Sequence, residues 1–534
     1  MIGMKGKVLP YVAALITAAL IASLSVALPA GIRVVREIAN VWIGTIYIRA
    51  DGSVYPPDAP IKTHDNVTYT LTGDIMSYAD GIVVERDNII LDGAGHTIQR
   101  KSNVTVSRSD PAPPPPLIYK GINIQGRSNV TIKNTVIIGF DYGIYLDHSF
   151  NNVIIRNDVT SNQIGIYLTG SSNYNIISEN NIANNDLGIR LWGHSNHNRI
   201  SRNNVTNNSG GILLSSSNNI ISENNIVNNG CGISLNHSFN NTITGNVFVN
   251  NSLVVLPPTY GNVVKSNTVN GKPLVYLEGV SGWVISDAGQ VILVKCKRIT
   301  IKGLNLSNTH VGIQLLETSD TRVISNNIAN NYFGIWLWYS SNNVISENNI
   351  MNNTDGILLS HSLSNIISGN NITGNTLDGI MLAYSSNNTV RGNNIANNKH
   401  GIWLAHSSNN VIYHNNFVNN SQHVRIDCYD VCPPTNVWDD GYPSGGNYWS
   451  DYTGVDSYSG PYQNETGSDG IGDTPYVIDE NNIDRYPLMN PWTQESEMAT
   501  PPSWIETRLR YFAVVVIAII VVTVAILRRK RRGV

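Results

Sequence analysis

Two aspartates and a histidine stand at one repeated position of this sequence. Asp355, Asp378 and His400 each precede the glycine of a phrase that recurs every 21 to 23 residues. If successive copies stack, their α-carbons lie one strand spacing apart, about 4.8 Å, and the repulsion between two neighbouring carboxylates raises the pKa of one of them. Such groups could act as acid and base on a glycosidic bond, or bind calcium. Aspartate before glycine is also ordinary turn chemistry, and we prefer that structural interpretation.

Large aromatic residues occupy positions that should face solvent. In a strand written G-I-x-L-x, the isoleucine and leucine point inward, so the two x positions point outward. Exposed aromatic rings on one sheet mark a contact surface, and flat rings flanked by polar groups suit the faces and hydroxyls of sugars. The alternatives are cross-strand stacking that stabilises the sheet, or cover by the C-terminal segment. The predicted glycan-binding residues, two of them at the turn after the strand, are Tyr145, Tyr167, Trp192, Trp336, Trp338, Tyr339, Tyr384 and Trp403.

Histidines recur at the fifth position after the glycine, where a metal centre could be sought. Four histidines share this position, but glycine, serine or tyrosine occupies it in coils between them. Only neighbouring coils come within metal-bond reach, so we do not expect a copper or zinc centre. The four are His148, His237, His361 and His406.

A turn-rich acidic segment follows the repeats, over 437–492. Asp469 and Asp473 bracket Gly-Ile-Gly, and their carboxylates together with backbone carbonyls could surround a calcium ion. The segment lacks the twelve-residue spacing and closing glutamate of an EF-hand, and it could also serve as an aromatic cap over the last coil. Just before it, Cys428 and Cys432 could form a disulfide outside the cytoplasm.

The repeated phrase predicts the fold. It reads G-I-x-L-x-x-S-x-N-N-x-I-x-x-N-x-I-x-N-N, and each copy holds three short alternating apolar pieces bounded by Asn, Ser or Gly. A unit this short cannot bury its own apolar side chains, so the copies must stack around a continuous core of isoleucines. Handedness follows from the near-universal chirality of parallel crossovers. We therefore predict an all-β fold, a right-handed single-stranded parallel β-helix with three strands per coil. The copies begin at Gly121, Gly143, Gly165, Gly188, Gly211, Gly232, Gly312, Gly334, Gly356, Gly379 and Gly401.

Asparagines at the turns should also stack. At one register, inward-turned amides could hydrogen-bond up the axis as a ladder, which is a structural role. Many asparagines, such as Asn66, Asn129 and Asn464, also lie in N-x-S/T sequons, and some glycosylation of an external protein stays open. The predicted ladder is Asn152, Asn175, Asn198, Asn219, Asn241, Asn343, Asn365, Asn388 and Asn410.

The chain has an apolar segment near each end. Residues 1–27 read as a secretory signal or, alternatively, as an uncleaved anchor. Residues 511–527 carry no charge and precede the basic tail 528–534, which predicts one C-terminal transmembrane helix, a cytoplasmic tail and an extracytoplasmic body. The net charge of −3 favours neither nucleic acid nor an anionic membrane surface as a partner.

The body of the chain should contain four parts. These are an N-terminal cap and first coils with a Pro-rich loop over 32–120, repeats over 121–433 interrupted at about 252–311 within one helix, a C-terminal cap over 434–492 and a linker over 493–510.

The segments that flank the repeats resemble a known family. TIYIRADGSVYPPDAPI and NIILDGAGHTI before the repeats, and GNYWSDY and DGIGDTPY after them, are similar to archaeal cell-surface proteins of the NosD-like β-helix group, also described as carbohydrate-binding and sugar-hydrolysis repeats. The resemblance covers most of the chain between the signal and the linker. It implies a right-handed β-helix, with either copper-site maturation or sugar binding and hydrolysis. No catalytic motif of pectate lyases or polygalacturonases can be carried over residue by residue, and fold alone does not settle function.

Three functional hypotheses follow. The first is a protein anchored at the cell surface that binds polysaccharide or cell-envelope glycan along an exposed aromatic face, with calcium as a structural ion. The second is a polysaccharide hydrolase or lyase that uses the carboxylates beside that face. The third is a NosD-like accessory protein for copper-site maturation.

Overall fold

The computed structural model describes residues 41–101, 118–427 and 435–493, which form an all-β right-handed parallel solenoid of about 16 turns. A typical coil consists of β13 (Tyr142–Asp147), β14 (Val153–Ile155) and β15 (Asp158–Thr160), and each of these strands pairs in parallel with its counterpart in the next coil. The predicted parallel β-helix is confirmed. The predicted signal segment and transmembrane helix lie outside the described residues, and within them no helix has the length and apolar character needed to span a membrane.

Glycine and isoleucine columns hold the coils at strand spacing. Ile144, Ile166 and Ile189 are Cα partners in successive coils, and all three are fully buried. One residue before them stands the glycine of the phrase. A Cβ on Gly165 would lie 2.6 Å from the carbonyl oxygen of Gly188 in the next coil, so only glycine lets the coils approach this closely.

Asparagine side chains form three internal ladders, one at each turn of the coil. In the predicted ladder, Asn152 donates through Nδ2 to Oδ1 of Asn175 over 3.0 Å. A second column contains Asn370, whose Nδ2 donates to Oδ1 of Asn393 and whose Oδ1 accepts from the amide of Asn348, each over 2.9 Å. The predicted ladder is confirmed, and two further columns accompany it. Along each column, successive coils therefore contribute buried amides that satisfy the backbone of the coils on either side.

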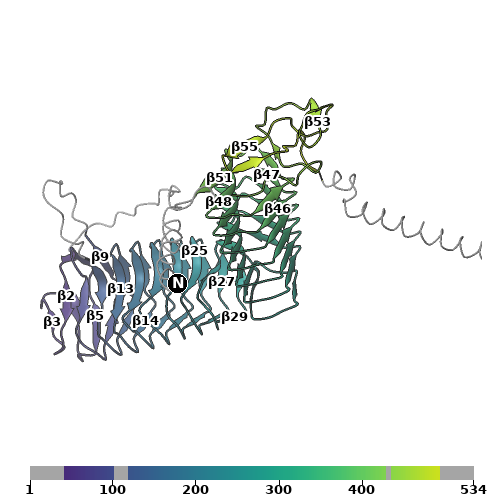
Figure 1. Cartoon of the computed structure of the whole chain (residues 1–534). Helices are drawn as coiled ribbons and strands as arrows, with labels where there is room; N and C mark the ends of the chain where they lie inside the picture. The colour runs from purple at the N-terminus through teal and green to yellow at the C-terminus, as the bar shows by residue number, and fades with distance from the viewer. Residues whose placement is uncertain (1–40, 102–117, 428–434, 494–534) are drawn as a thin grey trace, which may run out of the picture.

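The axis of the solenoid turns sharply at one hairpin. β30 (Thr268–Val269) pairs antiparallel with β31 (Lys272–Glu278), and β31 pairs in parallel with β33 (Gln290–Val294). The first strands of the later coils thus extend the sheet made by the third strands of the earlier coils. Figure 1 shows the result, a first stack (41–271) from whose far end a second stack (272–427) rises at a steep angle. The stretch 252–311, where the repeat phrase lapses, contains this change of direction.

The second stack covers the open end of the first. β28 (Leu253–Leu256) is the last strand of its sheet, so its outer backbone groups would be unpaired. Gln290 of β33 accepts from the amide of Leu253 over 3.2 Å and donates to its carbonyl over 2.6 Å. Gln314 of β36 (Val311–Leu316) makes the same pair of bonds to Val255, at 3.2 and 2.7 Å. Two side-chain amides therefore replace the strand that the first stack lacks.

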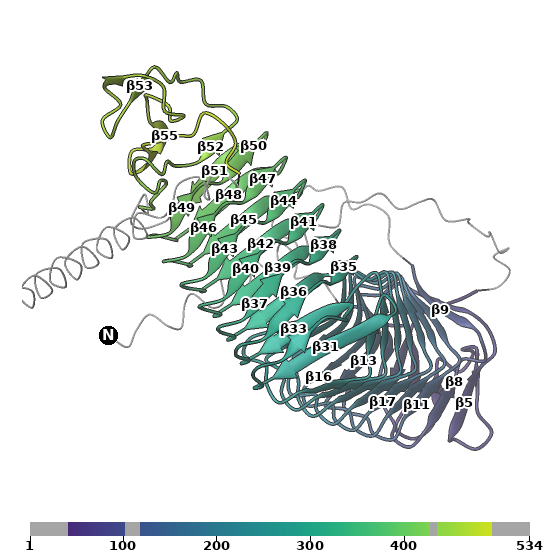
Figure 2. The same ribbon diagram turned by 90° about the vertical axis from the view of Figure 1, so that its right-hand side faces the viewer.

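A cap formed by residues 435–493 closes the other end of the second stack (Figure 2). The indole of Trp449 stacks on the last-coil ring of Phe417, with centroids 4.4 Å apart. The second asparagine ladder ends at Asp484, whose Oδ2 accepts from the amide of Asn447 over 2.7 Å and from Nε1 of Trp449 over 2.8 Å. Burial raises the pKa of Asp484 to about 7, despite these hydrogen bonds. The cap thus covers both the apolar core and the free end of a ladder.

We predict that an internal asparagine contributes much more to the free energy of unfolding than the neighbouring asparagine on the outer face. Asn370→Ala leaves several buried backbone and amide groups without partners and should lower the free energy of unfolding by about 3 kcal/mol or more. The matched variant Asn371→Ala removes a half-buried amide of the outer face, bonded to Asn349 over 2.9 Å, and should cost less than about 1 kcal/mol. Urea unfolding of the two variants measures the difference; equal costs would contradict the role given to the ladders.

Candidate functional site

Aromatic rings gather on the outer face of the first stack, over β13, β16 (Ile164–Thr169) and β19 (Leu187–Leu191). Tyr145 and Tyr167 are Cα partners, and their ring centroids lie 5.8 Å apart. Tyr142 lies 5.4 Å from Tyr145 and 5.0 Å from Tyr167. The tyrosines are half-buried, while Trp192, just after β19, is 45% exposed. The structure thus groups three of the predicted residues. It also adds Tyr142, which directly precedes the phrase glycine, a position at which the sequence analysis considered only aspartates and a histidine.

Two cations complete this cluster. The guanidinium carbon of Arg190 lies 5.3 Å from the ring centroid of Tyr167 and 5.0 Å from that of Trp192. The ammonium group of Lys120, on β10 (Lys120–Asn123), lies 5.6 Å from the centroid of Tyr145. Such cations are attracted to the electron-rich faces of the rings. We call Lys120, Tyr142, Tyr145, Tyr167, Arg190 and Trp192 together the aromatic patch.

The phenol of Tyr145 keeps its proton at neutral pH. Burial, and secondarily the nearby Asp147 carboxylate, raises the pKa of Tyr145 to about 12. Burial also raises the pKa of Tyr142, which the neighbouring Arg190 partly opposes. Both hydroxyls are therefore neutral hydrogen-bond donors. The patch residues that carry a formal charge are Lys120 and Arg190, and the Asp147 carboxylate lies at the border of the patch.

Trp336 and Trp338 of β39 (Phe333–Trp338) are buried, with exposed fractions of 1% and 8%. The prediction that they form an exposed glycan platform is wrong. They belong to the apolar cluster of the first stack, because the outer face of β33, β36 and β39 covers the open end of that stack. The aromatics of the two halves consequently do not share one surface.

Tyr339 and Tyr384 are 45% and 37% exposed but lie in a continuous column of rings. Tyr339, His361, Tyr384 and His406 stack in order, with centroids 4.8, 5.0 and 4.7 Å apart. Each inner ring covers the faces of its neighbours, so the column mostly offers ring edges to solvent. A sugar that stacks on an aromatic side chain needs a free face. These tyrosines therefore suit the cross-strand stacking alternative.

Asp355, Asp378 and His400 come together on the second stack, at the starts of β42 (Asp355–Ser360), β45 (Asp378–Ala383) and β48 (His400–Ala405). Nδ1 of His400 lies 2.7 Å from Oδ1 of Asp378, and the amide of Asp378 donates to Oδ1 of Asp355 over 3.2 Å. All three are at most 7% exposed. Beside them, the guanidinium carbon of Arg425 lies 4.2 Å from the ring centroid of Trp403, over one face of that predicted sugar-binding residue.

Burial controls the protonation of this acidic cluster. Desolvation raises the pKa of both carboxyls, and Asp378 adds to the shift of Asp355 by charge repulsion. Desolvation, and secondarily the charges of Arg425 and Lys399, lowers the pKa of His400. The cluster therefore favours a neutral histidine beside carboxyl groups that retain protons more readily than usual, a state from which a proton can be donated.

The aspartates proposed to bind calcium lie in loops of the cap. The carboxylate of Asp473 accepts from the amides of Ser457 and Tyr458, each over 3.0 Å. Asp469 accepts from the amide of Ile471 over 3.1 Å and from Nε2 of Gln463 over 3.2 Å. Both carboxylates thus already order the loop, and calcium binding here stays a prediction. Cys428 and Cys432 lie outside the described residues.

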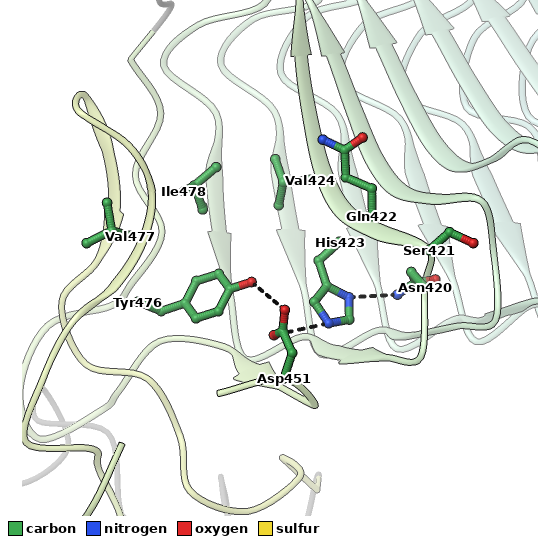
Figure 3. A pocket seen from close by; sticks show the side chains of 9 residues that line it. All are labelled: Asn420, Ser421, Gln422, His423, Val424, Asp451, Tyr476, Val477 and Ile478. Carbon is green, nitrogen blue, oxygen red and sulfur yellow. Dashed lines mark hydrogen bonds and ion pairs between the residues drawn. The ribbon is translucent and has the colours of Figure 1, made fainter. Parts of the chain in front are cut away.

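A pocket of about 270 Å³ opens between the last coil and the cap (Figure 3). Tyr476 donates through its hydroxyl to Oδ2 of Asp451 over 3.2 Å, and Nε2 of His423 lies 3.3 Å from Oδ1 of the same carboxylate. Nδ1 of His423 lies 3.3 Å from Nδ2 of Asn420, the last amide of the third ladder. His423 occupies the register of Gly401, a place where a side chain fits because no further coil follows. The sequence predictions did not include this pocket, although the replacement of the phrase glycine by histidine was a signal for it.

Two family models match parts of the chain. Residues 259–454 match the model described as "Periplasmic copper-binding protein (NosD)", and residues 120–286 match "Right handed beta helix region". No curated protein matches the sequence.

Several solved structures show a weak likeness. The A-module of the mannuronan C-5 epimerase AlgE4 of Azotobacter vinelandii is 16% identical over 69% of this chain and 88% of its own, with a TM-score of 0.21. The tailspike protein of an E. coli bacteriophage, solved with a pentasaccharide, is 11% identical over 61% and 64%, with a TM-score of 0.29. The catalytic domain of an alpha-1,3-glucanase is 14% identical over 61% and 59%, with a TM-score of 0.24.

The copper named by the first family model does not fit the described side chains. His361 and His406 are kept apart by the ring of Tyr384. Cys231 and Cys296 are buried in different stacks, and burial raises the pKa of both thiols, which opposes the thiolate form that binds metal. Within residues 41–101, 118–427 and 435–493, no three His, Cys, Asp or Glu side chains gather closely enough to hold a metal ion. Each of the two family matches covers less than half of the chain, and both agree with the three-strand coils of the structure.

Proposed function

We propose that the chain binds polysaccharide through the aromatic patch of the first stack. The observation that carries the proposal is the grouping of Tyr145, Tyr167 and Trp192 on three successive coils, with Trp192 45% exposed. Aromatic side chains on an outer strand face are costly to leave in water, and a contiguous group of them marks a contact surface. Four aromatic residues together provide more apolar surface than a chance exposure of one ring.

The surroundings of the patch suit a sugar chain. Asn123 on β10 is the Cα partner of Tyr145, and Thr169 at the end of β16 is the partner of Asp147. Amide, hydroxyl and carboxylate groups therefore border the rings on the same sheet. A sugar presents C–H faces that pack on aromatic rings and hydroxyls that bond to such groups. An extended glycan that runs along the coils would meet both kinds of contact.

We also propose that the body is exported and held at the membrane by residues 511–527. This placement rests on the sequence alone, on an uncharged apolar run followed by the basic residues 528–532. Alkaline carbonate extraction of membranes tests it: the full chain should stay in the pellet, and a chain ending at residue 510 should be released.

Trp192→Ala should weaken binding of the polysaccharide about tenfold, because it removes the most exposed ring of the patch. Isothermal titration of the full chain against a panel of polysaccharides provides the measurement. Trp283→Ala is the matched control, since Trp283 is 56% exposed on the second stack and lies outside the patch. An equal effect of the two substitutions, or none from Trp192→Ala, would rule out the patch as the binding surface.

The second candidate function is cleavage of a polysaccharide at the second stack, away from the aromatic patch, and the 2.7 Å contact between Asp378 and His400 favours it. A carboxyl with a raised pKa beside a neutral histidine provides an acid and a base within reach of each other. Release of reducing ends should then fall at least about 100-fold in Asp378→Asn. Asp320→Asn, an exposed acid of the second stack, should cleave as the parent does; undiminished release in Asp378→Asn would end this candidate.

A further inference from the structure

We propose that the polysaccharide bound by the aromatic patch is anionic, and that Arg190 and Lys120 bind its acid groups. The inference rests on the proposed function and names the chemical class of its ligand.

The charge of Arg190 is not neutralised by a carboxylate of the described residues. In the part of the chain that the structure describes, its guanidinium forms no ion pair, and its Nε is buried without a hydrogen-bond acceptor. Other arginines of the same stack are neutralised: Nε of Arg156 lies 2.9 Å from Glu179, and Nε of Arg202 lies 2.9 Å from Glu223. The rings of Tyr167 and Trp192 hold Arg190 in place but leave its charge uncompensated.

The carboxylates near the patch already have partners within the chain. Asp80 accepts from the amide of Lys120 over 2.8 Å and from Nδ2 of Asn123 over 3.3 Å. Asp141 pairs with Arg100 over 3.1 Å. Asp147 accepts from Nε2 of Gln125 over 2.9 Å and lies 2.7 Å from Nδ1 of His148. An acid group from outside the chain is therefore the partner that the patch lacks.

The spacing of the two cations indicates a polymer. Lys120 lies on β10 and Arg190 on β19, three strand spacings apart, which is roughly 14 Å, and the tyrosines lie between them. One small acid cannot reach both cations, whereas a chain with repeated uronate or sulfate groups can contact both while its rings pack on Tyr145 and Tyr167. The planar fork of an arginine suits either kind of acid group. Nucleic acid fits less well, because its affinity depends on many phosphate contacts and the patch offers two cations.

The test compares the charged and uncharged forms of one polysaccharide. The full chain is titrated with polygalacturonate and with its fully methyl-esterified form, in which the same polymer has lost its charge. We expect the ester to bind at least about tenfold more weakly, and we expect added salt to weaken binding of the acid form only. Arg190→Gln and Lys120→Gln should each remove much of the preference for the acid form, while Arg202→Gln, the matched control from a neutralised pair, should retain it.

The outcomes separate this inference from the function on which it rests. If the acid and ester forms bind with equal affinity and Trp192→Ala weakens the binding of both, the ligand need not be anionic. The proposal that the patch binds polysaccharide would then still stand. Binding of single-stranded DNA that matches polygalacturonate in affinity and in sensitivity to Arg190→Gln overturns the choice of a glycan. No binding of any polysaccharide overturns both. Thermal melting of Arg190→Gln and Lys120→Gln, expected to match the parent, shows that any loss reflects the charge.

Discussion

The close stacking of one coil on the next is the constraint on which the whole structure depends. A coil of this length has no core of its own, so its isoleucines are buried only when another coil lies above and below. Glycine permits that approach, as at Gly165, where a Cβ would lie 2.6 Å from the next coil's carbonyl oxygen. The amide ladders then bond the buried turns of neighbouring coils to each other, as Asn370 does with Asn393. The burial of apolar side chains and the hydrogen bonding of buried amides thus both run along the solenoid axis.

A stack of this kind has two ends, and each end exposes apolar side chains and unpaired strand edges. The chain covers one internal end with the outer face of its own second stack, where Gln290 and Gln314 bond to β28. Trp336 and Trp338 pack at this contact between the two stacks and are therefore shielded from solvent. At the last coil, where no glycine is required, His423 extends into the cap and bounds the pocket with Asp451 and Tyr476. The sheet faces that cover the end of a stack are buried, so binding surfaces must lie on the other outer faces.

Local periodicity made most of the fold predictable. The alternation within each copy indicated the strands, the glycine interval indicated the coil, and the pre-glycine register correctly brought Asp378 beside His400. The change of axis was not predictable in this way, because it depends on one short antiparallel pairing between β30 and β31. For the same reason Trp338 is buried and Trp192 is exposed, although both stand four residues after the phrase glycine. Periodicity determines which side of a strand a residue is on, whereas the packing of distant segments determines whether that side meets water.

The aromatic patch groups the predicted sugar-binding residues Tyr145, Tyr167 and Trp192 on one outer sheet face, with Trp192 45% exposed. Hydroxyl-radical footprinting of the full chain, read out by mass spectrometry with and without the polysaccharide that binds most tightly, examines this directly. We expect Tyr145, Tyr167 and Trp192 to be labelled in the free protein and protected in the complex, and Trp336 and Trp338 to remain unlabelled in both. Protection confined to the second stack, or strong labelling of Trp336 in the free protein, would contradict binding at the aromatic patch.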